Sequence, residues 1–356
     1  MNDFTVRFML DGKALAHQTQ IRLDEVSWAA IGGCEAARVF VSGGLNALWM
    51  WTTRLMAHVE IYAPDAILVW SGVLWGVTVR TPVGTFDYSM DKVANRVAVQ
   101  YSYETGGGVG ERAETDWAED ADSMVRYGTI EKYLSISGAT PDAAEGLRAR
   151  YLASYAWPQA VSDPNTSVTQ AEAEMVLFGH WARTAHLIYG DAEIGQEDTA
   201  TIAQRIAGQF GFIEDTSSLV QASGLSTTRH RDDSHTGQFE LDALAEIGTA
   251  AGERVLVGID ERKRFYFKPA DGEVTYYYRD MSVLNLREQA VQPWAVRPGT
   301  WLQQLDVVTP VLQDVRPPGR LFVERVTMRR DPDDWNVEIE PLDAQSVESL
   351  IVAGLQ

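Results

Sequence analysis

The sequence predicts an α+β fold with two β-barrel-like regions, one at each end of the chain, and a helical or mixed region between them. Three observations predict this class. Short strand-like alternations separated by turn residues, about every 8–12 positions, fill the first hundred residues. Helical periodicity is confined to the middle of the chain, and alternating segments return in its last third.

The N-terminal region consists of expected strands with one exception. Phe4–Leu10 alternates apolar and polar residues, and Asp11-Gly12 follows it as a hairpin-turn signal. Leu45–Leu55 is apolar on all sides and fits a short buried helix. A barrel or a sandwich would accommodate so many short strands. The further strands expected here are Ile21–Trp28, Ala37–Val41, His58–Tyr62, Ile67–Trp70, Trp75–Arg80 and Arg96–Tyr103.

The composition changes at Glu104. The segment Glu104–Met124 is rich in glycine and carries seven acidic residues against the single base Arg112. Such a composition is typical of a solvated loop, and it indicates a linker at 105–127.

Helix signals appear in the middle of the chain. Thr140-Pro141 provides an N-cap and a first-turn proline for a helix that ends at Trp157-Pro158. Two further helices are expected from Asp198 or Thr199 to Gly211 and over Phe239–Ala251. The segment Ser162–Gly195 fits no element clearly.

The last part of the chain returns to strands. A hairpin is expected from Arg254–Ile259 and Arg264–Lys268, followed by strands at Val274–Tyr278, Trp301–Val308, Arg320–Met328 and Trp335–Glu340. We therefore expect an N-terminal barrel domain at 1–104, the linker at 105–127, a helical or mixed peripheral domain at 128–195, an α/β domain at 196–272, and C-terminal barrel strands at 273–356.

The charge balance excludes whole classes of function. Fifty acidic residues against 30 basic ones give a formal charge of −20, which disfavours a nucleic-acid binder or a partner of anionic membranes. With one cysteine, Cys34, no intramolecular disulfide and no cysteine zinc site is expected. No segment has the length and apolarity of a membrane span, and the N-terminus has no signal-peptide pattern.

No catalytic or cofactor-binding constellation stands out. His230–His235 is the densest group of candidate metal ligands, but its flanks have loop composition, so we expect a polar loop and no metal or cofactor. Gly106–Gly110 lacks the residues of a phosphate-binding loop. Trp49, Trp51, Trp70 and Trp75 fit either a sugar-binding stripe or, as we favour, a barrel core.

A set of segments carries a family resemblance through its order along the chain. These segments are Ala66–Leu74 after the strand His58–Tyr62, the helix Gly138–Pro158, the helices at Thr201–Ala207 and Leu241–Gly252, the hairpin with Asp260–Arg262 and Phe265–Phe267, Val296–Leu302, and Leu321–Thr327. In this order they resemble the hub proteins of tailed bacteriophages, also called minor tail proteins, tail-tip hubs or baseplate hubs. The resemblance spans roughly residues 1–345, and no single motif is diagnostic.

The resemblance implies a non-enzymatic structural protein of the virion. Such hubs form a trimer whose paired barrels line the DNA channel and adapt three-fold to six-fold symmetry. The implied partners are a distal tail or tube protein ring, the tape measure protein, and tail fibre or tip proteins, while DNA passes without specific binding. A peripheral tail-tip protein, a carbohydrate-binding adhesin and a cell-wall hydrolase with an acidic residue pair remain as alternatives.

The acidic excess leads to residue-level expectations. An acidic lumen repels phosphates, so we expect Glu60, Asp87, Glu324 and Glu338, all on β-rich segments, to line the channel. For contacts with neighbouring subunits or proteins we expect two loops. The first loop includes Gly106 and Asp116, and the second includes His230, Asp232 and His235.

Overall fold

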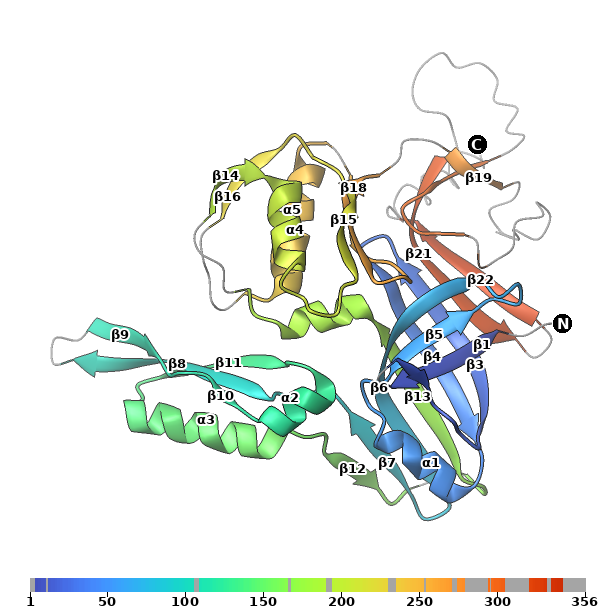
Figure 1. Cartoon of the computed structure of the whole chain (residues 1–356), viewed down its shortest axis with the longest axis horizontal. Helices are drawn as coiled ribbons and strands as arrows, with labels where there is room; N and C mark the ends of the chain where they lie inside the picture. Colours follow the sequence, from blue (N-terminus) through green and yellow to red (C-terminus); the bar gives the residue numbers. More distant parts are fainter. Residues whose placement is uncertain are drawn as a thin grey trace, which may run out of the picture.

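The computed structural model describes residues 4–10, 12–105, 109–165, 168–189, 194–229, 235–252, 254–270, 274–278, 294, 296–304, 320–331 and 334–341. Strands form most of this part of the chain and helices pack against them, so the predicted α+β class is confirmed. Figure 1 shows a large sheet on the right, a body with α2 and α3 at the lower left, and a body with α4 and α5 above it.

One hydrogen-bonded network of 16 strands forms the large sheet. Its main path runs β19-β20-β21-β3-β4-β13-β6-β5-β1-β2, and the other strands branch from it. The strands of the network are β1 (Thr5–Leu10), β2 (Lys13–Ala14), β3 (Gln20–Ala29), β4 (Gly32–Ser42), β5 (His58–Tyr62), β6 (Leu68–Thr81), β7 (Gly84–Ser89), β12 (Ala160–Asp163), β13 (Glu172–Gly179), β15 (Asp215–Val220), β17 (Val255–Ile259), β18 (Arg264–Pro269), β19 (Val274–Tyr278), β20 (Trp301–Gln304), β21 (Arg320–Asp331) and β22 (Asp334–Pro341).

The two β-rich ends of the chain meet in this sheet. β21 pairs antiparallel with β3, with Val326 opposite Trp28 and Met328 opposite Val26. The described strands form no closed barrel, so the expectation of two barrel-like regions is not met in this part of the chain. Alternation in the sequence encodes the buried face of each strand but not its pairing partner, which explains the difference.

β13 lies at the centre of the sheet, between β4 and β6. It falls in the segment to which the sequence assigns no element and inside the expected peripheral region. Alternate residues of β13 are buried, including Ala173, Met175 and Leu177, as a half-buried strand requires. The expected strands Ile67–Trp70 and Trp75–Arg80 are a single strand, β6.

The main core includes residues from both ends of the chain. Phe8 and Trp51 are in contact inside it, with ring centroids 4.6 Å apart, and Trp51 belongs to α1 (Leu45–Thr52). The short buried helix expected within Leu45–Leu55 is therefore confirmed. Val326 and Met328 of β21 are fully buried in the same core, so the C-terminal strands share it with the N-terminal ones.

The second body is an insertion between β7 and β12. It contains β8 (Arg96–Thr105), β9 (Val109–Glu114), β10 (Ala118–Glu119), α2 (Ala121–Tyr127), β11 (Glu131–Ser137) and α3 (Pro141–Tyr155). The expectation of an acidic linker over Glu104–Met124 is wrong, because this segment contains β9, β10 and the start of α2. One of its acids, Glu119, is paired with Arg96 at 2.8 Å, and Arg96 also stacks over Trp117 at 4.7 Å.

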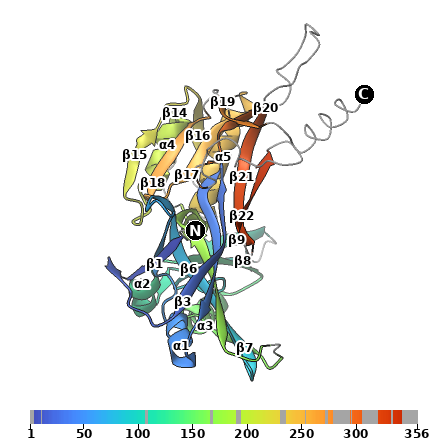
Figure 2. The same cartoon turned by 90° about the vertical axis from the view of Figure 1, so that its right-hand side faces the viewer.

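The third body packs two helices on β17 and β18. It adds β14 (Ile194–Asp198), α4 (Thr199–Ala207), β16 (Ser226–Arg229) and α5 (Gly237–Ala250) to those strands, and Figure 2 shows both helices beside them. The predicted helices are confirmed with capped starts: the side chains of Thr140, Asp198 and Thr236 accept hydrogen bonds from the first turns of α3, α4 and α5.

A close backbone approach joins the third body to the sheet. β17 pairs in parallel with the start of β4, where Gly33 lies opposite Ile259. Gly33 has a φ of +83°, and a Cβ there would lie 2.2 Å from the Ile259 carbonyl oxygen. Only glycine fits this position. Within the described residues, no helix is both long and apolar enough to cross a bilayer.

Truncating Met328 tests whether β21 and the N-terminal sheet share one core. We expect Met328→Ala to lower the free energy of unfolding by about 2–5 kcal/mol, because it leaves a cavity among fully buried residues. The exposed substitution Glu324→Gln on the same strand should change it by less than about 0.5 kcal/mol. Urea unfolding measures both, and equal effects of the two variants would contradict a shared core.

Candidate functional site

Two surfaces of the molecule concentrate charged side chains, and the first is a belt across the sheet. Its residues alternate in sign from strand to strand, and most of them alternate with buried neighbours along their own strands. Arg329 of β21 bridges Glu338 of β22 and Glu25 of β3, both at 3.1 Å. The charge belt consists of Glu338, Arg329, Glu25, Arg38, Glu174, Arg80 and Glu172.

The belt is continuous through cross-strand contacts. Glu25 lies opposite Arg38 in the pairing of β3 with β4. Arg38 contacts Glu174 at 3.3 Å, and Arg80 contacts the same carboxylate at 2.7 Å. Exposed pairs of this kind contribute little each, about 0–1 kcal/mol, but opposite charges favour one register over its alternatives.

The four expected channel residues occupy related positions. Glu60, Asp87 and Glu338 each alternate with core-facing neighbours, so they project from the side of the sheet that carries the belt. Glu324 is exposed and lies at a bulge in the pairing of β21 with β22. Glu60 accepts a hydrogen bond from the Tyr62 hydroxyl at 2.8 Å. A luminal position for these residues stays a prediction.

The expected interface residues lie apart from the belt. Asp116 is exposed beside α3, and its carbonyl accepts a hydrogen bond from Arg148. His235 precedes α5, where its Nδ1 atom is 2.7 Å from the Glu240 carboxylate. Gly106, His230 and Asp232 lie outside the described residues.

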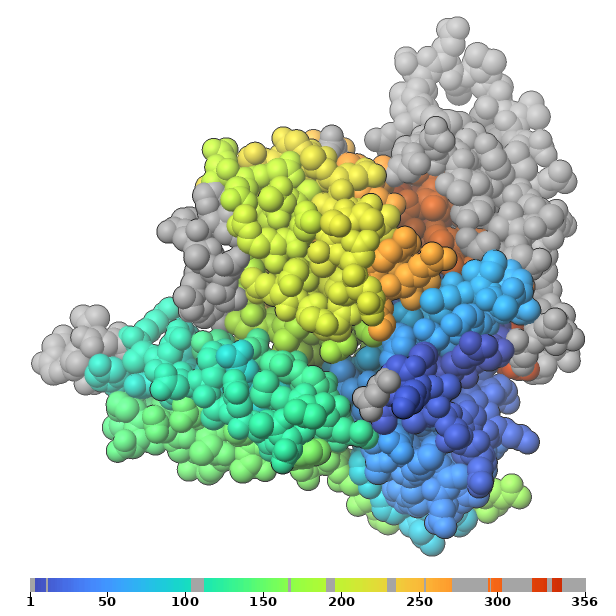
Figure 3. Space-filling model, in the orientation of Figure 1, coloured from blue at the N-terminus to red at the C-terminus, as the bar shows by residue number. Residues whose placement is uncertain are grey.

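The second charged surface is a cleft of about 470 Å³ where the sheet and the two smaller bodies meet. We call it the junction cleft. Its walls come from the β1–β2 hairpin, β5, the end of α2, the 3-10 helix η1 (His180–His186) and the β17–β18 turn. It is lined by Met9, Leu10, Gly12, Met56, His58, Glu60, Leu68, Arg126, Tyr127, Gly128, Arg183, Glu214, Glu261, Arg262 and Lys263. In Figure 3 it lies in the region where the blue, green and yellow parts of the surface adjoin.

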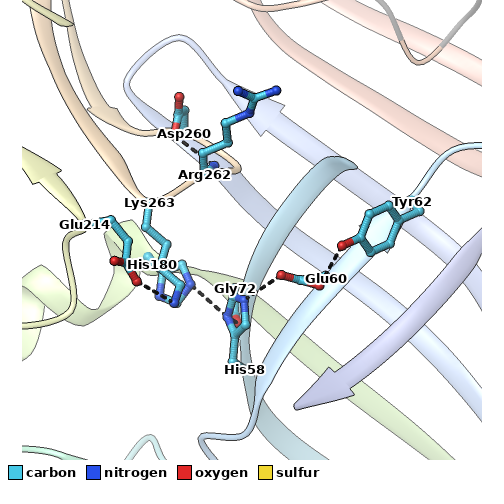
Figure 4. Close-up of polar contacts among 9 residues, drawn as sticks. All are labelled: His58, Glu60, Tyr62, Gly72, His180, Glu214, Asp260, Arg262 and Lys263. Atoms are coloured by element: carbon cyan, nitrogen blue, oxygen red, sulfur yellow. Dashed lines mark hydrogen bonds and ion pairs between the residues drawn. The ribbon is translucent and has the colours of Figure 1, made fainter. Parts of the chain in front are cut away.

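A row of polar side chains runs through this junction (Figure 4). The rings of His58 and His180 stack with centroids 5.2 Å apart, and His180 Nε2 is 3.2 Å from His58 Nδ1. His58 Nδ1 also lies 3.1 Å from the Gly72 carbonyl oxygen, and its Nε2 lies 3.4 Å from Glu60. At the other end of the row, Lys263 contacts Glu214 at 3.4 Å.

The chemistry of this pair follows from its burial. Because a carbonyl oxygen only accepts, we assign the His58 proton to Nδ1, shared between Gly72 and His180 Nε2. Burial lowers the pKa of both histidines, well below the usual value for His180, and the nearby cations Lys263 and Arg183 lower it further. Both rings are therefore neutral at pH 7, and His180 Nδ1 has no hydrogen-bond partner among the described residues.

The described residues offer no constellation for catalysis or metal binding. No group of three or more histidine, cysteine, aspartate or glutamate side chains in this part of the chain is placed to hold a metal ion. Burial raises the pKa of the Cys34 thiol to about 12, so the thiolate needed for nucleophilic attack does not form at neutral pH.

The tryptophan stripe is mainly core. Trp51 and Trp70 are fully buried, Trp75 is 4 % exposed, and only Trp49 among the four is partly exposed. This burial disfavours a sugar-binding groove built from them.

Sequence reasoning missed the junction cleft. Its histidines are 122 positions apart, and His180 has no spacing signal that links it to His58. The alternation of His58 with Val59 and Ile61 places it on the polar face of β5, but the covering η1 falls in the segment without an assigned element. Only the tertiary arrangement brings the two together.

The solved structures that are similar to this chain include two tail proteins. The tail protein from Neisseria meningitidis MC58 aligns with 95% of this chain and 96% of its own, at 9% identity and a TM-score of 0.44. The 43 kDa tail protein of prophage MuSo2 from Shewanella oneidensis aligns with 96% of this chain and 97% of its own, at 8% identity and a TM-score of 0.43. These values establish neither a common fold nor a common function. No family model and no curated protein matches the chain.

The neutral histidine pair predicts a stability that depends on pH. Since folding lowers both pKa values from 6.5, the unfolded chain takes up protons first as the pH falls, and the folded state loses stability below about pH 6.5. The expected loss is at most about 1.4 kcal/mol per pH unit for each histidine. Urea unfolding at pH 7.5, 6.5 and 5.5 measures it.

A variant pair isolates this contribution. His180→Phe removes one titrating group and keeps a ring against Phe212, so it should reduce the loss of stability between pH 7.5 and pH 5.5. Val59→Ala, a buried neighbour on β5 without a titrating group, should lower stability equally at all three pH values. An unchanged pH dependence in His180→Phe would show that the pair is not the cause.

Proposed function

We propose that this protein is a structural, non-enzymatic component of a bacteriophage tail, and within the tail a trimeric hub that closes the tube. The observation that carries the proposal is the order of the hub-like sequence segments, most of which coincide with an element of the described fold. Ala66–Leu74 belongs to the β5–β6 hairpin and Gly138–Pro158 contains α3. Thr201–Ala207 and Leu321–Thr327 lie within α4 and β21, and Leu241–Gly252 overlaps most of α5. Asp260–Arg262 and Phe265–Phe267 lie within the β17–β18 hairpin.

The charge distribution supports the role of the hub in DNA passage. The chain carries a net charge of −20, and the belt pairs its arginines with glutamates, so the sheet surface presents no unpaired basic stripe along the belt. Such a surface repels or ignores phosphates. In this proposal Glu60, Asp87, Glu324 and Glu338 face the channel. The partners are the distal tail or tube ring, the tape measure protein, and fibre or tip proteins at the virion tail tip.

The burial of Trp51, Trp70 and Trp75 and the lack of a metal-binding cluster among the described residues favour a structural role over the adhesin and hydrolase alternatives. An adhesin needs aromatic rings in an open groove, whereas Trp51 and Trp70 have no exposed surface.

Assembly state and sugar binding together test the hub proposal. We expect negative-stain images of the concentrated protein, alone or with its tail partners, to show a three-fold ring with a central opening. We also expect no change in tryptophan fluorescence with cell-wall oligosaccharides. A protein that stays monomeric with its tail partners and binds such oligosaccharides saturably would overturn the proposal in favour of an adhesin.

DNA binding provides a separate test of the channel role. A 30-bp duplex at about 50 mM salt should show no mobility shift with the protein, because too few unpaired cations are available to release phosphate counterions. A shift that weakens steeply with added salt would contradict a non-adhesive channel surface. A DNA-binding protein of known affinity serves as the positive control.

A further inference from the structure

The junction cleft holds a guanidinium without a counterion. Arg183 of η1 lies over the Phe212 ring, with its Cζ atom 3.9 Å from the ring centroid. On another side, a Cβ added to Gly128 would lie 3.2 Å from Arg183 Nη2, so the backbone there approaches the guanidinium closely. Within the described residues, Arg183 makes no hydrogen bond and no ion pair. The residue is partly exposed, and its donors have no protein partner in this part of the chain.

Burial makes this arrangement costly for the protein alone. Desolvation lowers the pKa of Arg183 to about 10, which still leaves the group charged at pH 7. A desolvated charge is normally paired or hydrogen-bonded, since an uncompensated one destabilises the fold. Two of the three acids that line the cleft already have partners: Glu60 accepts a hydrogen bond from Tyr62, and Glu214 contacts Lys263.

The remaining charges of the cleft favour an anion that carries one negative charge. The side chain of Arg262 also has no ion pair in the described part of the chain, whereas its backbone N–H is held by Asp260. Glu261 adds a negative charge to the same wall. A dianion such as phosphate would meet this carboxylate and Glu60, while a carboxylate presents one charge in a plane that matches a guanidinium fork.

Part of the lining of the cleft is apolar. It includes Met9, Leu10, Met56 and Leu68, and methionine side chains adapt to varied apolar surfaces. A ligand that matches both the charged and the apolar lining therefore carries a carboxylate next to apolar side chains, which is the chemistry of an acidic residue within a hydrophobic peptide segment.

We propose that the junction cleft is a docking site for an acidic peptide segment of a partner protein, whose carboxylate pairs with Arg183 while its apolar neighbours contact Met9, Leu10, Met56 and Leu68. The site goes beyond the structural role proposed above and is tested on the isolated chain. A failure of peptide binding would leave the tail proposal standing, and a failure of ring formation would leave this site standing.

Three probes distinguish the chemistry of the ligand. They are the peptide acetyl-Leu-Glu-Leu-amide, its neutral counterpart acetyl-Leu-Gln-Leu-amide, and inorganic phosphate, each titrated calorimetrically into the full-length protein. We expect the glutamate peptide to bind at least about ten-fold more tightly than the glutamine peptide and than phosphate, because a charge-assisted pair forms only with the first. Its affinity should fall as salt is raised.

Matched variants place the binding at Arg183. Arg183→Met should weaken the glutamate peptide about ten-fold or more, and Arg183→Lys should weaken it less, because the charge remains but the fork is lost. The control Arg22→Met removes an exposed arginine that also lies over a phenylalanine ring, at 5.3 Å from Phe40 on β4, and should leave the affinity unchanged. Thermal unfolding confirms that each variant is folded.

Several results would overturn the proposal. They are the absence of binding by the glutamate peptide, equal affinity for the two peptides, tighter binding of phosphate, and affinities that are the same in the wild type and in both Arg183 variants. If Arg183→Met does not fold, the Arg183→Lys variant decides between these outcomes.

Discussion

The antiparallel pairing of β21 with β3 is the constraint on which the rest of the structure depends. It joins segments about 300 positions apart in one sheet, with Val326 opposite Trp28 and both buried in the main core. Closing so long a loop costs conformational entropy, and the shared core offsets that cost. The ion pairs of Arg329 with Glu25 and Glu338 cross the same strands and favour this register over a shifted one.

The junction cleft is a consequence of the same architecture. The insertion between β7 and β12 and the helical body after η1 both pack against the sheet near β5, which leaves charged side chains at their meeting point. This junction is polar, but some of its groups have no partner among the described residues. They are the Nδ1 atom of His180, in the neutral His58–His180 pair, and the guanidinium of Arg183. If the chain is a structural tail component, as proposed, such a recess is suited to receive a segment of a neighbour, which connects the two proposals without making either depend on the other.

The sequence predicted local structure well and long-range structure poorly. Cap residues predicted where the helices begin. The side chains of Thr140 and Asp198 accept hydrogen bonds from the first turns of α3 and α4, as expected of N-caps. The prediction of a linker after Glu104 was wrong, because composition does not reveal that Arg96 lies beside Glu119 and Trp117. The central position of β13 and the cleft could not be predicted, because pairing and tertiary contacts between distant segments leave no periodic signal.

The copy number of the chain in purified phage particles tests the central claim most directly. Quantitative mass spectrometry against the tube and capsid proteins, combined with antibody labelling of intact virions, measures it. A trimeric hub predicts three copies per particle and label at the tip of the tail only. Absence of the chain from purified particles, or label along the whole tail with a copy number like that of a tube protein, would contradict the account.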